Sequence, residues 1–504
     1  MSQINILLKR TTKGTLVLSL FTFLAMPLGY LIRIFYARTL TVQEFGLFYS
    51  IVGLLGLISC FNDLGLSNAL SYFIPKYMVK KNYQKVKSAI LMTFIVQLST
   101  IFFIAWSFWL LAPILAESYF KTLLAIPLLR CFTLYFFFYN FAISMQNAFR
   151  GLQEEKYYGS FEFLRTLVVL TLSFSGLFVP VKRVLLYGVV WGMAYLLLGV
   201  FYFITMLKSH KEIFNAKTVL DFTLLKAHLR YSVPLLIGSI TSNILLRMDL
   251  ILLTYLRSVG IVGLYTVAVS LANALTNLLS PLNSLLVPFV SELDAKRTNL
   301  STFLSTLYKY AMIFFVPLGI LMFFFAKEVL IVLFSSRFMG ATNALKILSI
   351  MCLFNALTAL NNSCLQGLGK TKFLMWTAVL GGSLNLCLDL ILIPKFGADG
   401  AAIATSGVWI LCFSITLLYL RRLVNLNVKK SEILKLGFVG LLFISLIHSL
   451  KSILALSLYV EAIVVFIISL TAYSFLLSVF KIISLKNLIS FFISIFGQTS
   501  SEHH

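Results

Sequence analysis

Residues 44–76 read EFGLFYSIVGLLGLISCFNDLGLSNALSYFIPK. The stretch is almost wholly apolar, yet it holds Asn62 and Asp63 near its middle and four glycines. As one helix from Phe45 to Phe73 it would be about 43 Å long, against a hydrocarbon core of about 30 Å. Such a helix must tilt, bend at a glycine or protrude, and it carries a carboxyl group to a depth that lipid alone does not tolerate.

A second copy of this pattern lies about half a chain further on. Residues 261–293 read IVGLYTVAVSLANALTNLLSPLNSLLVPFVSEL, in which residues 263–265 (GLY) correspond to residues 46–49 (GLFY). The second copy has no acid at the depth of Asp63 and offers Pro281 in that region instead. The two halves therefore differ there, and we expect a coupling-ion site or an asymmetric gate at this depth.

The composition is that of a membrane protein. Of 504 residues, 60% are hydrophobic and 12% charged, and the mean hydropathy is +0.96, whereas soluble domains are about half apolar and a quarter charged. The net charge of +24 comes from basic residues in short gaps between apolar runs, as in cytoplasmic loops that face anionic headgroups. We therefore expect membrane lipid, and not nucleic acid, as the partner. The six cysteines lie in apolar segments without metal-ligand spacing, so no metal site and no cofactor are expected.

Fourteen apolar segments are long enough to span a bilayer, and they must be helices because isolated strands leave backbone groups unsatisfied in lipid. They cover residues 15–37, 45–73, 88–112, 122–147, 157–179, 184–207, 229–256, 261–290, 303–325, 341–366, 373–393, 398–420, 433–452 and 455–480. The sequence thus predicts an all-α polytopic protein.

The repeat extends over six helices in each half. Residues 150–153 (RGLQ) follow the fourth helix as residues 366–369 (QGLG) follow the tenth. Because six is even, both halves enter the membrane in the same direction, which gives a parallel repeat about an axis along the membrane normal. Two such bundles enclose a cavity that rocking opens to either side. We predict a six-helix bundle over 1–212, a second over 213–428, helices thirteen and fourteen over 429–482, and an amphipathic or disordered tail over 483–504.

Lys and Arg residues are concentrated at the two ends of the chain and in the even-numbered loops. By the positive-inside rule, this bias predicts that both termini lie in the cytoplasm. The dominant clusters are Lys76/Lys80/Lys81/Lys85/Lys87, Lys208/Lys211/Lys217/Lys226/Arg230 and Arg421/Arg422/Lys429/Lys430. We interpret them as topology determinants on a lipid surface.

Charged residues inside the spans are the best functional candidates, since each costs about 2.5–3.5 kcal/mol at a helix centre on insertion scales. Arg33 lies late in helix one and Arg247 late in helix seven, at comparable places in the two halves. A guanidinium fork matches phosphate oxygens, so the pair suits an anionic ligand in a shared cavity. For Arg33, snorkelling to the membrane surface is an equal alternative.

Asp63, Asp249 and Asp389 are candidate ion-coupling or cavity residues. A carboxyl group in a span can hold a proton or Na⁺ in one state and release it in another, while the alternative is a structural hydrogen bond to a neighbouring helix. Glu162 and Arg165 are i,i+3 neighbours, which favours a self-satisfying pair.

No catalytic motif emerges. Residues 369–371 (GKT) resemble the end of a phosphate loop, but the glycine required five positions earlier is Cys364. The loops are too short for a soluble catalytic domain, and no outer loop offers a carboxylate pair for acid–base work. We therefore expect a non-enzyme driven by an H⁺ or Na⁺ gradient or by the gradient of its substrate.

The chain resembles the polysaccharide biosynthesis or oligosaccharidyl-lipid flippase family of the multidrug/oligosaccharidyl-lipid/polysaccharide (MOP) exporter superfamily. The resemblance rests on residues 44–77, on 247–275 (RMDLILLTYLRSVGIVGLYTVAVSLANAL), on 365–373 (LQGLGKTKF) and on 385–409 (NLCLDLILIPKFGADGAAIATSGVW). It implies two six-helix bundles around a V-shaped cavity, a MATE-like fold, with two additional C-terminal helices.

The resemblance also implies a function. Family members move polyprenyl-(pyro)phosphate-linked oligosaccharide to the outer leaflet of the cytoplasmic membrane by alternating access, with cavity arginines on the pyrophosphate; Arg33 and Arg247 fit that role. Polysaccharide polymerases or glycosyltransferases are the implied partners. The acids leave a cation-coupled multidrug antiporter of the same fold as an alternative, and a non-transporting scaffold for polysaccharide assembly as a third.

Overall fold

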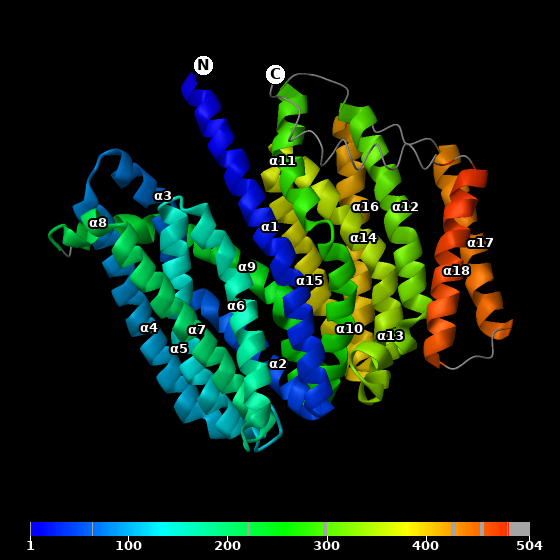
Figure 1. Cartoon of the computed structure of the whole chain (residues 1–504), viewed down its shortest axis with the longest axis horizontal. Helices are drawn as coiled ribbons and strands as arrows, with labels where there is room; N and C mark the ends of the chain where they lie inside the picture. Colours follow the sequence, from blue (N-terminus) through cyan, green and yellow to red (C-terminus); the bar gives the residue numbers. More distant parts are fainter. Residues whose placement is uncertain are drawn as a thin grey trace. The chain divides into compact units, whose positions relative to one another are not determined.

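The computed structural model describes residues 2–62, 64–218, 222–295, 300–424, 430–453, 458–480 and 482. All regular structure in these ranges is helical (Figure 1), which confirms the predicted all-α class. The elements are α1 (Ser2–Thr39), α2 (Val42–Ile58), η1 (Ser59–Phe61), α3 (Leu66–Val79), α4 (Tyr83–Ser118), α5 (Ala125–Gly151), α6 (Glu155–Ser175), η2 (Gly176–Phe178), α7 (Arg183–Ser209), α8 (Lys211–Asn215), α9 (Phe222–Leu256), α10 (Val259–Asn277), α11 (Ser280–Ala295), α12 (Leu300–Phe324), α13 (Ala326–Leu333), η3 (Ser336–Ala341), α14 (Thr342–Gly367), α15 (Thr371–Phe396), α16 (Ala398–Val424), α17 (Lys430–Ile453) and α18 (Leu458–Val479).

Eleven of the described helices are long and apolar enough to cross a membrane. Two further apolar helical stretches, Val42–Ile58 and Val464–Val479, are shorter than such a span. The protein is therefore a multi-pass membrane protein, but the predicted count of fourteen spans is not confirmed.

Both over-long segments that the sequence singled out are broken. The segment predicted over 45–73 divides into α2, η1 and α3, with Gly65 in the left-handed conformation (φ 78°) that glycine adopts without strain. The segment predicted over 261–290 divides into α10 and α11. Of the three ways to fit a long apolar stretch into a bilayer, the chain uses a bend in both places.

The start of α2 is fixed by a capping box. The Thr41 hydroxyl accepts a hydrogen bond from the Glu44 backbone N–H at 3.2 Å, and Glu44 Oε2 accepts one from the Thr41 backbone N–H at 2.9 Å. Two backbone donors that the first turn leaves unpaired are thereby satisfied. This cap sets the register in which the glycines of α2 meet their neighbours.

A row of glycines brings α2 and α3 close to α9 and α10. A Cβ atom at Gly46 would collide with Val259 O and stand 2.7 Å from Gly263 N, and one at Gly65 would stand 2.9 Å from Ser232 O. Between them, Gly53 faces Leu250 and Gly56 faces Arg247. The pairing order shows that α9 runs antiparallel to α2 and α3. The Thr254 hydroxyl of α9, which donates to Ser50 Oγ at 3.0 Å, joins the same pair of helices.

By packing, the chain divides into two compact units. Unit 1 comprises Met1–Val267 and Gly382–Ala401, and unit 2 comprises Ala268–Gly381 and Ala402–His504. Unit 1 therefore holds α1 to α9, the start of α10 and the second half of α15. The bundle boundaries predicted at residues 212, 428 and 482 stay a prediction.

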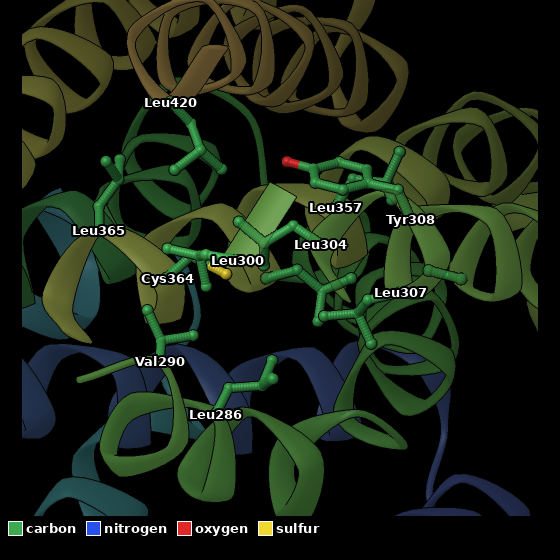
Figure 2. Packing of buried hydrophobic residues seen from close by; sticks show 12 residues of the cluster. Leu286, Val290, Leu300, Leu304, Leu307, Tyr308, Leu357, Cys364, Leu365 and Leu420 are labelled. Atoms are coloured by element: carbon green, nitrogen blue, oxygen red, sulfur yellow. The ribbon is translucent and has the colours of Figure 1, made fainter. Parts of the chain in front are cut away.

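Unit 2 is built around an apolar cluster to which α11, α12, α14 and α16 contribute (Figure 2). Leu304, Leu360 and Leu365 are among its fully buried members. Packing of this kind holds helices together in lipid by van der Waals contact, because the surrounding hydrocarbon is as apolar as leucine.

Two ion pairs attach α17 to the neighbouring helices of unit 2. Lys309 Nζ of α12 lies 3.2 Å from Glu432 Oε2, and Lys451 Nζ lies 2.7 Å from Glu328 Oε1 of α13. Lys451 also donates to Phe324 O at 2.8 Å. The pairs lie at opposite ends of α17, so the helix is fixed at both.

Candidate functional site

Arg33 projects from α1 onto aromatic rings. Its Cζ lies 5.6 Å from the ring centroid of Tyr49 on α2 and 6.0 Å from that of Tyr30, and the Tyr49 hydroxyl interacts directly with the guanidinium. Cation–π contacts of this kind contribute about 0.5–2 kcal/mol, depending on solvent exclusion. The half-buried Arg33 is thus held between α1 and α2.

Arg247 occupies space that Gly56 leaves open. The guanidinium packs against Gly56 so closely that any side chain there would collide with it. Its Nε is buried and has no hydrogen-bond partner in the described part of the chain. An unpaired buried donor costs about 1–3 kcal/mol, and more when it is charged. Among the described residues, Arg247 Nε is therefore a cationic donor without an acceptor.

Arg165 on α6 links the two predicted arginines. Tyr49 lies within electrostatic reach of both Arg33 and Arg165, and Tyr135 on α5 within reach of both Arg165 and Arg247. Arg165 thus connects the two electrostatically, through Tyr49 on the side of Arg33 and through Tyr135 on the side of Arg247, and together these residues form the Arg33–Arg247 cluster.

Glu162 balances the charge of Arg165. Glu162 Oε2 lies 2.7 Å from Arg165 Nη2, as the i,i+3 spacing predicted, and the Arg165 side chain is 17% exposed. Trp191 and Tyr195 on α7 complete its surroundings, with ring centroids 6.0 and 5.9 Å from Cζ. Because Arg165 is neutralised, the positive charge available to a ligand comes from Arg33 and Arg247.

Asp249 and Asp389, named separately from the sequence, form one polar cluster. Asn385 Nδ2 donates to Asp249 Oδ1 and to Asp389 Oδ2, each at 2.8 Å, and Tyr265 Oη donates to Asp249 Oδ2 at 2.6 Å. The two carboxyl groups also interact with each other. Asp389 is completely buried, and its Oδ1 is without a hydrogen-bond partner among the described residues.

This cluster is suited to a small cation or a proton. Two carboxylates in contact within a buried site repel each other unless a proton or cation neutralises part of their charge. Carboxylate oxygens are the ligands that hard cations prefer. Asp389 Oδ1, which has no partner among the described residues, is the oxygen that could accept such a ligand.

Arg257 fixes the helices that carry this cluster. Its Nε donates to Ile393 O at 3.0 Å, and its Nη2 donates to Pro394 O. These carbonyls belong to the last turn of α15, where a basic group satisfies unpaired acceptors. Arg257 follows α9 directly, so it joins the end of α9 to the end of α15 about two turns from Asp249 and one turn from Asp389.

Sequence reasoning missed three of these residues. Asn385 stands four residues before Asp389, on the same helical face, and this spacing was the available signal. Tyr265 and Arg257 carried no signal beyond their place near a helix end. Asp63 lies outside the residues that the structure describes.

The fold is shared with solved transporters. A structure described as the lipid II flippase MurJ, in an inward closed conformation, matches with a TM-score of 0.73 over 94% of this chain and 100% of that chain, at 15% identity. Two structures described as a multidrug-resistance MATE family transporter of the MOP superfamily, in different conformations, also match at 15% identity. The inward-facing one has a TM-score of 0.64 over 80% of this chain and 96% of that chain, and the outward-facing one 0.57 over 83% and 96%. These similarities establish a MurJ- and MATE-like fold, as the sequence predicted.

The family follows from the sequence itself. The model of the polysaccharide biosynthesis protein family matches residues 11–294, more than half of the chain, and the chain belongs to that family. It is 28% identical over 505 residues to the uncharacterized membrane protein MJ1068 of Methanocaldococcus jannaschii, covering 96% of this chain and 98% of that one. A second protein of the same organism, the uncharacterized membrane protein MJ1375, is 26% identical over 223 residues, covering 42% and 52% of the respective chains.

Proposed function

We propose that the protein moves polyprenyl-(pyro)phosphate-linked oligosaccharide across the cytoplasmic membrane by alternating access, for the biosynthesis of a surface polysaccharide. Membership of the polysaccharide biosynthesis family supports the substrate class, and the fold, shared with a lipid II flippase, supports translocation. No covalent bond of the substrate changes in this process, so the protein acts as a transporter and not as an enzyme.

The observation that carries the proposal is Arg247 Nε, which is buried and has no hydrogen-bond partner among the described residues. A buried, charged donor without a partner is costly, and a pyrophosphate oxygen would satisfy it. Arg33, which packs against the buried Tyr49, supplies a second guanidinium. These arginines favour an anionic group such as a pyrophosphate, and family membership supports the attached oligosaccharide.

We further propose that Asp249, Asn385 and Asp389 hold the coupling ion, H⁺ or Na⁺. The orphaned Asp389 Oδ1 and the contact between the two carboxyl groups support this role. Binding of the ion would relieve the repulsion between the carboxylates, so it favours the state in which α9 and α15 stay together.

The proposed orientation has both termini in the cytoplasm. The lysine-rich turn between α3 and α4 and the segment after α7 support it by the positive-inside rule. In this orientation the substrate enters from the leaflet where lipid-linked sugars are assembled, which makes glycosyltransferases and a polysaccharide polymerase the proposed partners.

The test is transport by the purified protein in liposomes. A lipid-linked oligosaccharide is placed in one leaflet, and its arrival in the other is followed with a membrane-impermeant lectin. Arg247→Ala should slow transport about 10- to 100-fold, the loss expected for a charge-assisted hydrogen bond pair. Arg247→Lys should retain part of the activity, because an ammonium keeps the charge but lacks the planar fork.

Arg230→Ala is the matched control, since Arg230 is an exposed arginine on the same helix, α9. It should transport at the wild-type rate. Wild-type transport by a correctly inserted Arg247→Ala protein would refute the assigned role.

A second candidate function is cation-coupled export of a drug-like cation. The similarity to MATE transporters and the buried acid pair favour it. Efflux of a cationic dye distinguishes the two functions. Efflux that is lost on substitution of Asp389 but unchanged on substitution of Arg247 would establish the antiporter.

A further inference from the structure

At one end of unit 1, the turn between α3 and α4 lies beside the segment that joins α7 to α8. A pocket of about 300 Å³ opens between them. Its lining includes Met78 and Tyr83 from the first segment, and Lys208, His210, Lys211 and Glu212 from the second. The lysines of the lining, Lys208 and Lys211, come from the second segment.

The pocket has a rigid floor. Ile213 is buried in an apolar cluster with Val86 and Ile90 of α4. Lys87 Nζ donates to Phe214 O at 2.6 Å and to Ala216 O at 2.8 Å, which fixes the end of α8 to α4. Since Lys87 is used for this contact, it does not contribute to the open part of the pocket.

The open part is positively charged. The side chains of Lys208 and Lys211 are exposed at its rim. Glu212, the one acid in the lining, interacts with the Tyr83 hydroxyl. His210 Nε2 is buried and has no hydrogen-bond partner in the described ranges, because Glu154 Oε1 stands 3.8 Å away, beyond hydrogen-bond distance. His210 Nε2 faces Glu154, so the cations that a phosphate at the rim would neutralise are the ammonium groups of Lys208 and Lys211.

An exposed apolar side chain marks the rim as a lipid contact. Val79 is 86% exposed and is followed directly by the exposed Lys80 and Lys81. Apolar and basic side chains alternate in this way where a protein meets the headgroup layer of an anionic leaflet, with the apolar side chain in the acyl region and the ammonium groups at the phosphates. A soluble phosphate would need no such apolar neighbour.

We propose that this pocket binds the phosphate of an anionic lipid headgroup, separately from the Arg33–Arg247 cluster. Lys208 and Lys211 contact the phosphate, and Val79 contacts the acyl chains. The bound lipid would join the α3–α4 turn to the α7–α8 segment. The site is independent of the transported substrate.

The experiment uses the full chain in detergent and follows binding of dioctanoyl phosphatidylglycerol by native mass spectrometry. Dioctanoyl phosphatidylcholine and inorganic phosphate are the comparison probes. The wild-type protein should bind phosphatidylglycerol more tightly than either. Lys208→Ala/Lys211→Ala should weaken that binding about 25-fold, because each lysine at an anionic surface contributes about a fivefold change.

The matched control is Lys370→Ala/Lys372→Ala, which removes two exposed lysines from unit 2. It should bind phosphatidylglycerol as the wild type does. The proposal is overturned if the pocket variant binds like the wild type, if the control loses binding equally, or if the wild type binds neither lipid. Inorganic phosphate binding as tightly as the lipid would assign the pocket to a soluble anion and overturn the lipid assignment.

Discussion

Gly46→Ala tests whether the close approach of α2 to α10 holds unit 1 together. The added methyl would stand 2.7 Å from Gly263 N and closer still to Val259 O, both of them backbone atoms that no rotamer change can move. Non-bonded atoms settle about 3.5–4.0 Å apart, so the two helices must separate by roughly 1 Å or more. Overpacking that displaces backbone costs about 1–3 kcal/mol, and contact with backbone on the partner helix places this case at the upper end.

The assay is thermal or denaturant unfolding of the purified protein in detergent. The control is Gly407→Ala on α16, where an added Cβ meets nothing within 4 Å. The control should be neutral or stabilising by up to about 1 kcal/mol, since alanine favours helix more than glycine does. The two substitutions are chemically identical, so opposite signs isolate the packing effect. Equal unfolding midpoints for the two variants would refute the reasoning.

Three other substitutions probe the acid cluster and the ends of helices. Asp389→Asn should abolish the dependence of transport on an H⁺ or Na⁺ gradient, because it removes a carboxylate from the pair; transport in liposomes with and without each gradient measures this, and unchanged coupling would contradict it. Arg257→Ala should destabilise the protein by about 1–3 kcal/mol, since it leaves two carbonyls of α15 without their donor. The unfolding midpoint in detergent measures this loss, and Arg257→Lys should recover part of it. Lys451→Ala should lower the free energy of unfolding by up to about 3–5 kcal/mol, because Glu328 is 15% exposed and keeps its charge without a partner. An unfolding midpoint equal to that of the wild type would show that the ion pair contributes nothing to stability.

Much of the fold could be predicted because it follows from length and periodicity. An apolar run of residues 45–73 is too long for the bilayer, and this mismatch alone restricted it to tilting, bending or protruding. The choice of a bend depends on Gly65, whose left-handed conformation no propensity scale assigns in advance. The helices themselves were predictable because lipid permits no other backbone in a span of this length.

The site was less predictable because its contacts join distant parts of the chain. Asn385 and Asp249 are 136 residues apart, and their hydrogen bond depends on how α15 lies against α9. The repeat predicted that Gly46 corresponds to Gly263, yet not that these two equivalent glycines would touch each other. Arg165 was interpreted as a self-satisfied partner of Glu162. That pairing is confirmed, but the interpretation left out the position of Arg165, within electrostatic reach of Tyr49 and Tyr135.

The glycine row of α2 and α3 also affects how these helices can move. Helices that interlock through large side chains must climb over ridges to change register, and each step breaks packing on both sides. Where α2 meets α9 and α10 through Gly46, Gly53 and Gly56, there are few such ridges to climb. Sliding of α2 along α9 would instead break the Thr254–Ser50 hydrogen bond and displace the Arg247 guanidinium from its place beside Gly56. Tyr49 is on α2, so such a shift would also move the ring that contacts Arg33. A change in the arginine cluster and a shift of α2 along α9 are therefore coupled.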